Sequence, residues 1–297
     1  MTYPNLFSLV GNTPLIKLNS IFKNPDITVY AKLEGQNPGG SVKDRAAYNM
    51  IRSALERGEI NERITLIEAT SGNTGIALAM MAKQFNIAIE LVMPENSTQE
   101  RVDTMRAYGA TVILTPAKET IEGSIRYVEE KLKKPGYFNL NQFGNKDNYL
   151  AHYKTTGPEI WKDTEGKITH FVSAMGTTGT IMGTSMYLKE QSKQVQIVGA
   201  QPSDGSSIPG IRKWSPEYLP KIFDASRVDK VIEVSEVEAT QMARRLAKEE
   251  GIFAGMSSGG AVAVAEKLVA SLDGPTTIVS IICDRGDRYL SSDLFRE

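Results

Sequence analysis

The chain has few of the residues that form disulfide frameworks or metal sites. Its 297 residues include one cysteine, Cys283, and two histidines, His152 and His170. One cysteine cannot form an internal disulfide or a cysteine-based zinc cluster, and two histidines leave little room for a histidine-rich metal site. We therefore expect no metal, and we interpret both histidines as structural or surface residues.

An excess of one charge and long apolar runs are also missing. Thirty-four Lys and Arg residues against 35 Asp and Glu residues give a formal net charge of −1, which does not favour nucleic acid or a membrane surface. The longest apolar runs, such as residues 76–82, are far shorter than the roughly 20 residues of a membrane-spanning helix. The initial MTYPNLFSLVG does not join a basic stretch to an apolar core, so we expect no secretory signal and a cytoplasmic protein.

What the sequence does contain is an alternation of short apolar, β-branched runs with longer amphipathic ones. The predicted strands are 27–34, 64–68, 87–93, 111–114, 168–172, 196–200, 230–234 and 277–282, and the predicted helices are 42–57, 75–85, 98–108, 121–132, 179–191, 236–250 and 260–271. Strands that alternate with helices are typical of parallel sheets covered on both faces. The length suggests about two domains, and the irregular stretch 137–156 is a candidate junction between two α/β units. We therefore predict an α/β protein.

The first candidate site is the motif Asn37-Pro-Gly-Gly-Ser-Val-Lys-Asp-Arg45. Ser41, followed three residues later by Asp44, resembles a helix N-cap with a capping-box partner, which would place Lys43 in the first helical turn. The helix dipole disfavours an ammonium there and favours the neutral amine that a Schiff-base nucleophile needs. The alternative is an ordinary helix start whose lysine points to water.

The second motif, Glu68-Ala-Thr-Ser-Gly-Asn-Thr-Gly75, leads from a predicted strand into a predicted helix. Its hydroxyl groups, amide and backbone N–H groups meet at a helix N-terminus, which suits a carboxylate or phosphate. The alternative is a turn in which two glycines allow close packing.

The third motif, Ser173-Ala-Met-Gly-Thr-Thr-Gly-Thr180, has the same strand-to-helix setting. Residues 176–180 offer consecutive N–H donors and three hydroxyls to one phosphate. Their spacing matches neither the dinucleotide pattern G-x-G-x-x-G nor the P-loop, so a monophosphate cofactor is favoured.

The fourth motif, Gly255-Met-Ser-Ser-Gly259, matches the G-x-S-x-G pattern of serine hydrolases. That pattern expects the catalytic histidine after the serine, and both histidines precede Ser257. The fifth motif, Cys283-Asp-Arg-Gly-Asp-Arg-Tyr289, follows a predicted strand, so it lies at the carboxyl edge of a sheet, where α/β proteins bind ligands. The alternative for it is a charged turn with a small buried thiol.

Together these motifs resemble the cysteine synthase/cystathionine β-synthase family of fold-type II enzymes, which use pyridoxal 5′-phosphate. The resemblance extends from Gly11-Asn-Thr-Pro-Leu15 to Arg288-Tyr-Leu-Ser291, and the segments NPGGSVKDRAA, EATSGNTGIALAM, THFVSAMGTTGTIMG, GSSIPGIRKW and CDRGDRYLSS carry it. It implies a tryptophan synthase β-like fold with two domains, each a mostly parallel twisted sheet flanked by helices. Residues 39–150 would form a small substrate-loop domain, and residues 1–38 and 151–297 a large cofactor-binding domain.

The resemblance also implies a role for each matching residue. Lys43 would hold the cofactor as an internal aldimine and later act as the general base at the substrate Cα, Asn73 would bond the ring hydroxyl oxygen, and Ser257 would face the pyridine nitrogen. The cofactor phosphate would be bound by Gly176, Thr177, Thr178, Gly179 and Thr180. The substrate carboxylate would be held by Thr70, Ser71, Gly72, Thr74 and Gln142.

A hydroxyl at the pyridine nitrogen does not stabilise a protonated ring, which makes the cofactor a weaker electron sink and favours elimination at Cβ. This suits β-replacement, in which acetate leaves O-acetyl-L-serine and sulfide adds to the remaining aminoacrylate to give L-cysteine. The motif around Cys283, Asp284 and Arg285 resembles the B type of the family, which also accepts thiosulfate. We expect these three residues and Arg212 to contact substrate, and the two arginines to help admit the thiosulfate dianion to form S-sulfocysteine. A homodimer is implied by the resemblance.

Other members of the same cofactor family are the nearest alternatives. A serine or threonine dehydratase or a cystathionine β-synthase would share the lysine and the phosphate loop, but the Gly255–Gly259 and CDRGDRYL segments favour a cysteine synthase. A non-catalytic regulator is the alternative from another class, and the presence of both Lys43 and the carboxylate loop disfavours it.

Overall fold

The computed structural model describes residues 2–296, which form two compact units. The first unit contains the segment up to Val10 together with Lys43–Asn148, and the second contains Gly11–Val42 and the chain from Tyr149 onward. The chain therefore passes from one unit to the other three times. The expected assignment of residues 1–38 to the large domain differs from the structure at its start, where Leu6, Phe7 and Val10 pack against the apolar core of the first unit.

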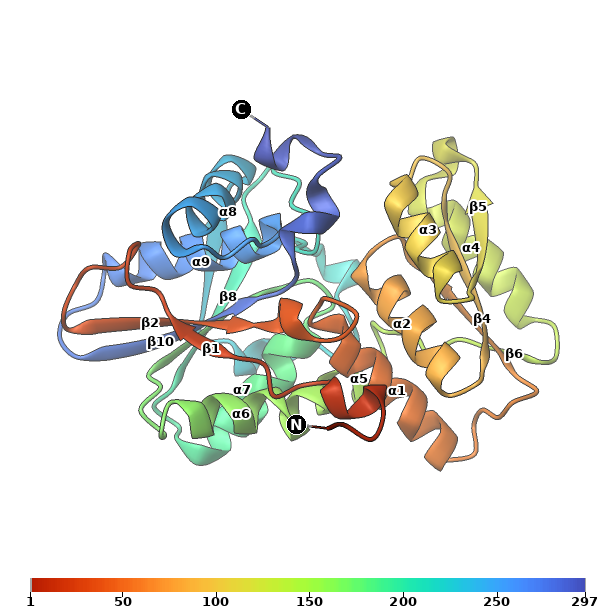
Figure 1. Ribbon diagram of the computed structural model, residues 1–297, viewed down its shortest axis with the longest axis horizontal. Helices are drawn as coiled ribbons and strands as arrows, with labels where there is room; N and C mark the ends of the chain where they lie inside the picture. The colour runs from red at the N-terminus through yellow and green to blue at the C-terminus, as the bar shows by residue number, and fades with distance from the viewer. Residues whose placement is uncertain (1, 297) are drawn as a thin grey trace. The chain divides into compact units, whose positions relative to one another are not determined.

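The second unit is built on a six-stranded sheet with the order β1-β2-β10-β7-β8-β9 (Figure 1). Strand β1 is antiparallel to β2, and all the other neighbours are parallel. The strands are β1 (Leu15–Lys17), β2 (Ile27–Leu33), β7 (His170–Ala174), β8 (Gln196–Pro202), β9 (Lys230–Val234) and β10 (Thr276–Ile282). Because their carboxyl ends meet at one edge, the loops that follow the parallel strands gather there.

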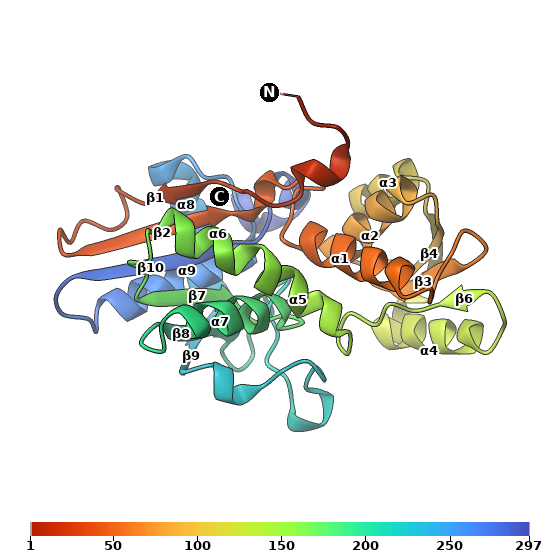
Figure 2. The same cartoon turned by 90° about the horizontal axis from the view of Figure 1, so that it is seen from below.

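Helices cover both faces of this sheet, as Figures 1 and 2 show. They are α5 (Lys146–Lys154), α6 (Thr156–Asp163), α7 (Gly179–Gln191), α8 (Glu236–Glu250) and α9 (Met256–Val269). Successive strand residues point to opposite faces. Val172 of β7 therefore packs in the cluster formed with α8 and α9, while its neighbour Phe171 packs in the cluster formed with α6 and α7. The sheet is thus buried on both sides.

The first unit contains a four-stranded parallel sheet with the order β5-β4-β3-β6. The strands are β3 (Thr65–Ala69), β4 (Ala88–Pro94), β5 (Thr111–Thr115) and β6 (Tyr137–Phe138), and the helices are α1 (Lys43–Glu56), α2 (Asn73–Gln84), α3 (Gln99–Ala107) and α4 (Thr120–Leu132). Leu66 of β3 packs in the cluster formed with α1, α2 and α3, while Ile67 packs with Val128 of α4 on the opposite face.

The predicted α/β class is confirmed, and each predicted strand and helix is present, three of them (β9, α7 and α8) with the predicted ends and the others with shifted ends. The largest shift is at α9, which begins at Met256 rather than at residue 260. Its first turns are made of Ser and Gly, which are weak helix formers. Close packing explains the difference, because a Cβ on Gly259 would lie 2.1 Å from the carbonyl oxygen of Ala239 in α8. Strands β1 and β6 and helices α5 and α6 are not among the predicted elements.

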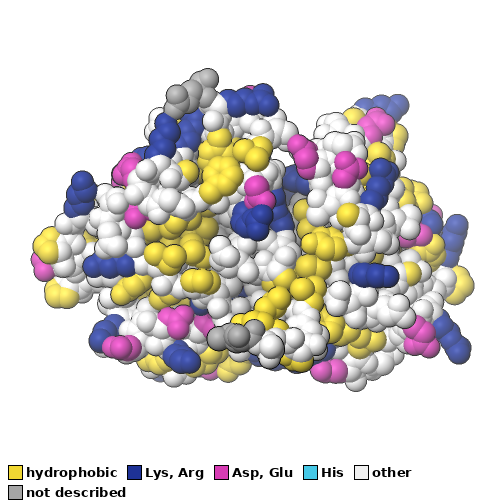
Figure 3. All heavy atoms as spheres, in the orientation of Figure 1, with side chains coloured by type: hydrophobic (Ala, Val, Ile, Leu, Met, Phe, Trp, Pro, Cys, Tyr) yellow, Lys and Arg dark blue, Asp and Glu magenta, His cyan; other side chains and the backbone are white. Residues whose placement is uncertain are grey.

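The surface carries no region of a single charge on the face drawn in Figure 3, where Lys, Arg, Asp and Glu side chains are interspersed. This distribution agrees with the formal net charge of −1. Among the described residues, no helix has both the length and the apolar character needed to cross a membrane.

Candidate active site

Three loops of the second unit meet at the carboxyl edge of its sheet: those after β2, β7 and β10. The backbone N–H of Val42 donates to the Cys283 carbonyl oxygen at 2.8 Å, and Ser41 forms an isolated antiparallel bridge with Asp284. The residues that precede Lys43 are therefore held against the loop that follows β10.

Lys43 is the first residue of α1, which confirms its predicted place in the first helical turn. It is half-buried, and it lies where the chain passes from the second unit to the first. The helix begins two residues after Ser41, whose backbone is used in the bridge with Asp284.

The predicted phosphate loop lies between the end of β7 at Ala174 and the start of α7 at Gly179. Thr178, the residue before the helix, has φ of 71°, a left-handed conformation that is costly for a β-branched residue. Its side-chain hydroxyl is buried and has no hydrogen-bond partner. A strained residue and an unsatisfied hydroxyl at a helix N-terminus, where backbone N–H groups are also available, are the features of an anion site.

The segment around Gly210 connects the phosphate loop to Ser257. A Cβ on Gly176 would lie 2.6 Å from the Gly210 carbonyl oxygen, so only glycine fits there. Trp214 Nε1 donates to the Gly176 carbonyl oxygen at 2.8 Å. Ser257, in the first turn of α9, is buried, and a Cβ on Gly210 would lie 3.4 Å from its Oγ. The structure therefore brings Ser257 and the phosphate loop to the same place.

The predicted carboxylate loop lies in the first unit, between the end of β3 at Ala69 and the start of α2 at Asn73. The structure joins it to Gln142, because Thr74 Oγ1 donates to Gln142 Oε1 at 2.9 Å and both residues are buried. Arg101 also donates to the Ser71 carbonyl oxygen at 3.3 Å. The loop that leads into α2 and the segment that contains Gln142, about 70 residues apart in the chain, thus form one cluster of polar side chains.

Glu68, the second-last residue of β3, contacts the segment that contains Gln142. Its carboxylate is 5% exposed and accepts hydrogen bonds from the Asn139 side chain at 2.9 Å and from the backbone N–H groups of Asn141 and Gln142. Burial raises the pKa of Glu68 to about 7, although the three donors act in the opposite direction. The sequence analysis gave this residue no role.

Comparisons with known proteins identify the family. The profile described as "Pyridoxal-phosphate dependent enzyme" matches residues 6–284. The chain belongs to this family. It is 57% identical to "Cysteine synthase B" of Pseudomonas aeruginosa, with 99% of this chain and 98% of the relative covered, and 55% identical to "Cysteine synthase B" of Escherichia coli, with 97% and 95% covered. A crystal structure of cysteine synthase from Entamoeba histolytica matches with a TM-score of 0.94 and 36% identity, covering 100% of this chain and 92% of that one.

As a member of the pyridoxal-phosphate-dependent family, the chain is an enzyme with the fold-type II architecture and uses pyridoxal 5′-phosphate. Its residues fit this cofactor. The unsatisfied hydroxyl of Thr178 and the close approach at Gly176 suit a phosphate group. Ser257 offers a neutral hydroxyl, and Lys43 offers an amine that would bind the aldehyde.

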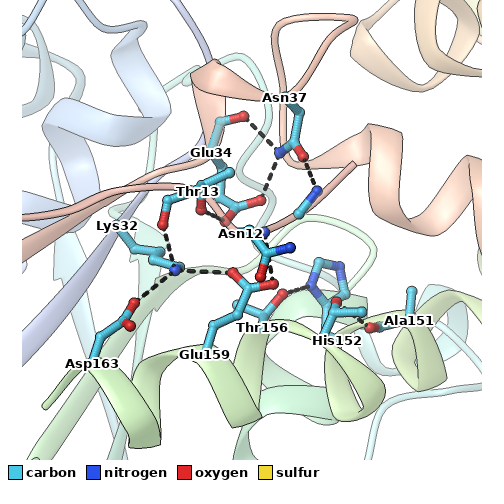
Figure 4. Close-up of polar contacts among 12 residues, drawn as sticks. Asn12, Thr13, Lys32, Glu34, Asn37, Ala151, His152, Thr156, Glu159 and Asp163 are labelled. Carbon is cyan, nitrogen blue, oxygen red and sulfur yellow. Dashed lines mark hydrogen bonds and ion pairs between the residues drawn. The ribbon is translucent and has the colours of Figure 1, made fainter. Parts of the chain in front are cut away.

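One histidine that the motifs did not assign supports the phosphate loop of this pyridoxal-phosphate-dependent enzyme. His152 of α5 is buried, its Nδ1 lies 2.9 Å from Thr156 Oγ1 (Figure 4), and its Nε2 lies 3.3 Å from Thr180 Oγ1. The imidazole therefore joins α6 to the first turn of α7. A lone histidine outside any motif gave no signal in the sequence. His170 is half-buried and pairs with Thr169.

A buried lysine crosses from the six-stranded sheet to α6 (Figure 4). Lys32 of β2 is fully buried, and its Nζ donates to the Thr13 carbonyl oxygen at 2.6 Å. The same nitrogen lies 2.9 Å from Glu159 and 3.3 Å from Asp163. Two carboxylates and a carbonyl oxygen thus satisfy a charge that would be costly to bury alone.

Glu34 extends this polar network toward the segment Asn37–Lys43 (Figure 4). Its fully buried carboxylate accepts from Thr13 Oγ1 at 2.7 Å and from Asn37 Nδ2 at 2.8 Å. Asn37 Oδ1 in turn accepts from the Gly11 backbone N–H at 2.8 Å. The first residue of the segment Asn37–Lys43 is therefore anchored by side chains that the motif itself does not contain.

The residues predicted to select the sulfur donor have different surroundings. Asp284 is buried and accepts from the Tyr289 hydroxyl at 2.6 Å, so it has a structural contact. Arg285 is exposed and pairs with Asp287, with 2.5 Å between Nη2 and Oδ2. Arg212 is exposed, and its guanidinium lies 5.3 Å from the centre of the Trp214 ring. The Cys283 backbone N–H donates to Ser258.

Proposed function

We propose that this enzyme is a cysteine synthase, which replaces the acetoxy group at Cβ of O-acetyl-L-serine with sulfide to give L-cysteine and acetate. The observation that carries the proposal is the nearly full-length similarity to relatives named cysteine synthase B. The motifs assigned to the cofactor and the substrate carboxylate occupy strand-to-helix loops in the structure, which supports it further. The first unit would supply the substrate loop and the second the cofactor-phosphate site.

Lys43 has two roles in the proposed reaction. Its amine would hold the cofactor and, when free, would take the proton from the substrate Cα. The bound cofactor supplies one function, the withdrawal of electrons from the Cα of the amino acid attached to it.

The other residues bind and orient. Thr70, Ser71, Gly72, Thr74 and Gln142 hold the substrate carboxylate, and Asn73 holds the cofactor ring hydroxyl oxygen. Gly176, Thr177, Thr178, Gly179 and Thr180 hold the phosphate. Ser257 places a neutral hydroxyl beside the ring nitrogen. Positive charge on the ring is then only weakly stabilised, which favours loss of acetate from Cβ.

The test is the visible absorbance of the purified protein. We expect a cofactor band that moves to longer wavelength on adding O-acetyl-L-serine and returns on adding sulfide. Lys43→Ala should abolish turnover, whereas Lys83→Ala, which changes an exposed lysine in the last turn of α2, should leave it intact. A wild-type spectrum that ignores O-acetyl-L-serine and responds to L-serine would overturn the proposal in favour of a dehydratase or a cystathionine β-synthase.

We also propose that thiosulfate serves as a second sulfur donor and gives S-sulfocysteine. Two exposed guanidinium groups support this, those of Arg212 and Arg285, because both belong to loops at the carboxyl edge of the sheet. The pairing of Arg285 with Asp287 makes Arg212 the stronger contributor. We expect Arg212→Ala to lower kcat/KM for thiosulfate about fivefold relative to sulfide, as for a surface charge that steers an anion. Lys213→Ala is the matched control, because Lys213 is already paired with Asp204 and Glu233. If the ratio of kcat/KM for thiosulfate to kcat/KM for sulfide is the same in both variants, Arg212 does not help to admit thiosulfate.

We propose further that the enzyme acts as a homodimer in the cytoplasm, which its resemblance to the cysteine synthase family supports. Light scattering should then give twice the 32.6 kDa of one chain. Cell fractionation should recover the activity with cytoplasmic markers. A mass of one chain would refute the dimer without affecting the proposed reaction.

A further inference from the structure

The two segments that form the carboxylate site of the first unit are linked by more than the contact between Thr74 and Gln142. Asn139 Nδ2 donates to the Ile67 carbonyl oxygen at 2.6 Å and to the Glu68 carboxylate at 2.9 Å. The backbone N–H groups of Asn141 and Gln142 donate to the same carboxylate. One side chain at the end of β3 therefore binds three donors of the segment 139–142.

The hydrogen bonds to Glu68 begin where the pairing between β3 and β6 ends. Strand β6 pairs with β3 through only two residues, at Thr65 and Leu66 of β3, and stops at Phe138. Beyond that point the N–H groups of the next residues need other acceptors. Asn141 has φ of 52°, and a left-handed residue lets successive N–H groups point toward one anion. In this unit the anion is the carboxylate of Glu68.

Gln142 is held on three sides. Its N–H donates to Glu68, its carbonyl oxygen accepts from Asn148 Nδ2 at 2.7 Å, and its side-chain Oε1 accepts from Thr74 Oγ1 at 2.9 Å. The contact with Thr74 occupies the amide oxygen and so fixes which way the amide nitrogen faces. Among the described residues, the contact with Glu68 is the one that connects the Gln142 backbone to the strand that leads into the carboxylate loop.

We propose that Glu68 is a positioning residue for recognition of the substrate carboxylate, because it ties the Asn141 and Gln142 backbone to the end of β3 and so orients the Gln142 amide beside Thr74. This inference rests on the proposed function of Gln142 and Thr74 in binding that carboxylate.

The burial of Glu68 supports a specific role. A buried carboxyl is costly unless hydrogen bonds satisfy it, and Glu68 is 5% exposed. Its pKa is affected by burial and by the three N–H donors. With no charged side chain among those groups, Glu68 is not one half of an ion pair. Its partners are the backbone and amide groups of the substrate-binding segment.

The experiment compares Glu68→Gln with Glu90→Gln. An amide has one acceptor oxygen and turns an NH₂ group toward the remaining donors, so Gln142 should move. We expect KM for O-acetyl-L-serine to rise about tenfold, kcat to change less than twofold, and KM for sulfide, which has no carboxylate, to stay constant. Glu90 faces Ile67 in the same sheet and bonds Tyr137, so its variant makes the same chemical change away from the segment and should leave all three constants unchanged.

Amide hydrogen exchange of the cofactor-free protein provides a readout that does not depend on activity. We expect Glu68→Gln to lower protection of the Asn141 and Gln142 amides at least tenfold, while Glu90→Gln leaves it unchanged. If wild-type enzyme fails to use O-acetyl-L-serine, the proposed function fails. Hydrogen exchange still tests the contact between Glu68 and the backbone of Asn141 and Gln142. Spectral titration with L-serine, compared with L-serinamide, then tests recognition of the carboxylate.

If Glu68→Gln does not fold, Asn139→Ala removes one donor and should raise KM about threefold in the same selective way. An unchanged KM for O-acetyl-L-serine, or equal losses for both substrates, would overturn the positioning role.

Discussion

Raising the pH from 4.5 to 7 should destabilise the fold through the buried carboxyl of Glu68. Its pKa is about 7 in the native state against an ordinary 4.5, and burial is the main cause. The native state then retains a proton that the unfolded chain has lost, so the contribution of Glu68 to stability is largest below pH 4.5 and is lost as the pH rises through 7. A carboxyl with this change of pKa contributes about 3 kcal/mol over that interval.

The assay is urea unfolding of the cofactor-free protein between pH 4.5 and 8, for wild type and Glu68→Gln. Circular dichroism is the suitable signal, because both tryptophans, Trp161 and Trp214, lie in the second unit while Glu68 lies in the first. Glutamine is neutral at every pH, and the other carboxyls titrate alike in both proteins. The free energy of unfolding of wild type should therefore fall about 3 kcal/mol relative to the variant across this range.

A difference between the two proteins that stays within about 1 kcal/mol from pH 4.5 to 8 would refute the reasoning. It would mean that the three N–H donors fully compensate the burial of the carboxylate. A difference that grows in the opposite direction would place the native pKa of Glu68 below 4.5. The control Glu90→Gln, on the neighbouring strand, should follow wild type over the whole range.

Three further substitutions test other parts of the structure. Lys32→Met should cost about 1–3 kcal/mol of unfolding free energy in urea denaturation, because it leaves the half-buried carboxylate of Glu159 without its cation; a cost under 1 kcal/mol would contradict the ion pair. Gly183→Ala should lower Tm by several degrees, since its Cβ would overlap the Tyr149 carbonyl oxygen; a Tm equal to wild type would show that α5 and α7 can separate freely. Thr178→Gly should stabilise the cofactor-free protein by about 1 kcal/mol in the same denaturation assay and weaken cofactor binding about tenfold in a titration, because it removes both the strained φ and the buried hydroxyl that we propose binds the phosphate; tighter cofactor binding would refute the assignment.

The elements with regular periodicity were predictable from the sequence. The apolar runs and helical patterns of 27–34, 179–191 and 236–250 depend on local spacing, and the structure places strands or helices there. The position of Lys43 at the start of α1 and the two strand-to-helix loops were predictable for the same reason. Short elements gave no such signal: β6 has two residues, and α6 contains Gly and Pro in its first turn.

The buried polar groups could not be predicted. Lys32 and Glu68 look like exposed charges in the sequence, because such residues are rarely buried unless they are paired. Their partners are distant in the chain: Glu159 is 127 residues from Lys32, and Asn139 is 71 residues from Glu68. Only the fold shows that each charge is buried and satisfied. Both lie next to segments that the motifs had assigned to the site.

The position of β10 has a consequence for synthesis on the ribosome. This strand lies between β2 and β7 in the middle of the six-stranded sheet, yet it is the last strand in the chain. Roughly 240 residues separate it from β2, so at about 5–20 residues per second the nascent chain holds β1 and β2 for on the order of 10–50 s before their neighbour emerges. The four-stranded sheet needs nothing beyond Asn148 and can form earlier. During that interval the exposed edge of β2 is a natural target for a chaperone, and a ribosome that stalls before codon 276 would release a chain that cannot complete its larger sheet.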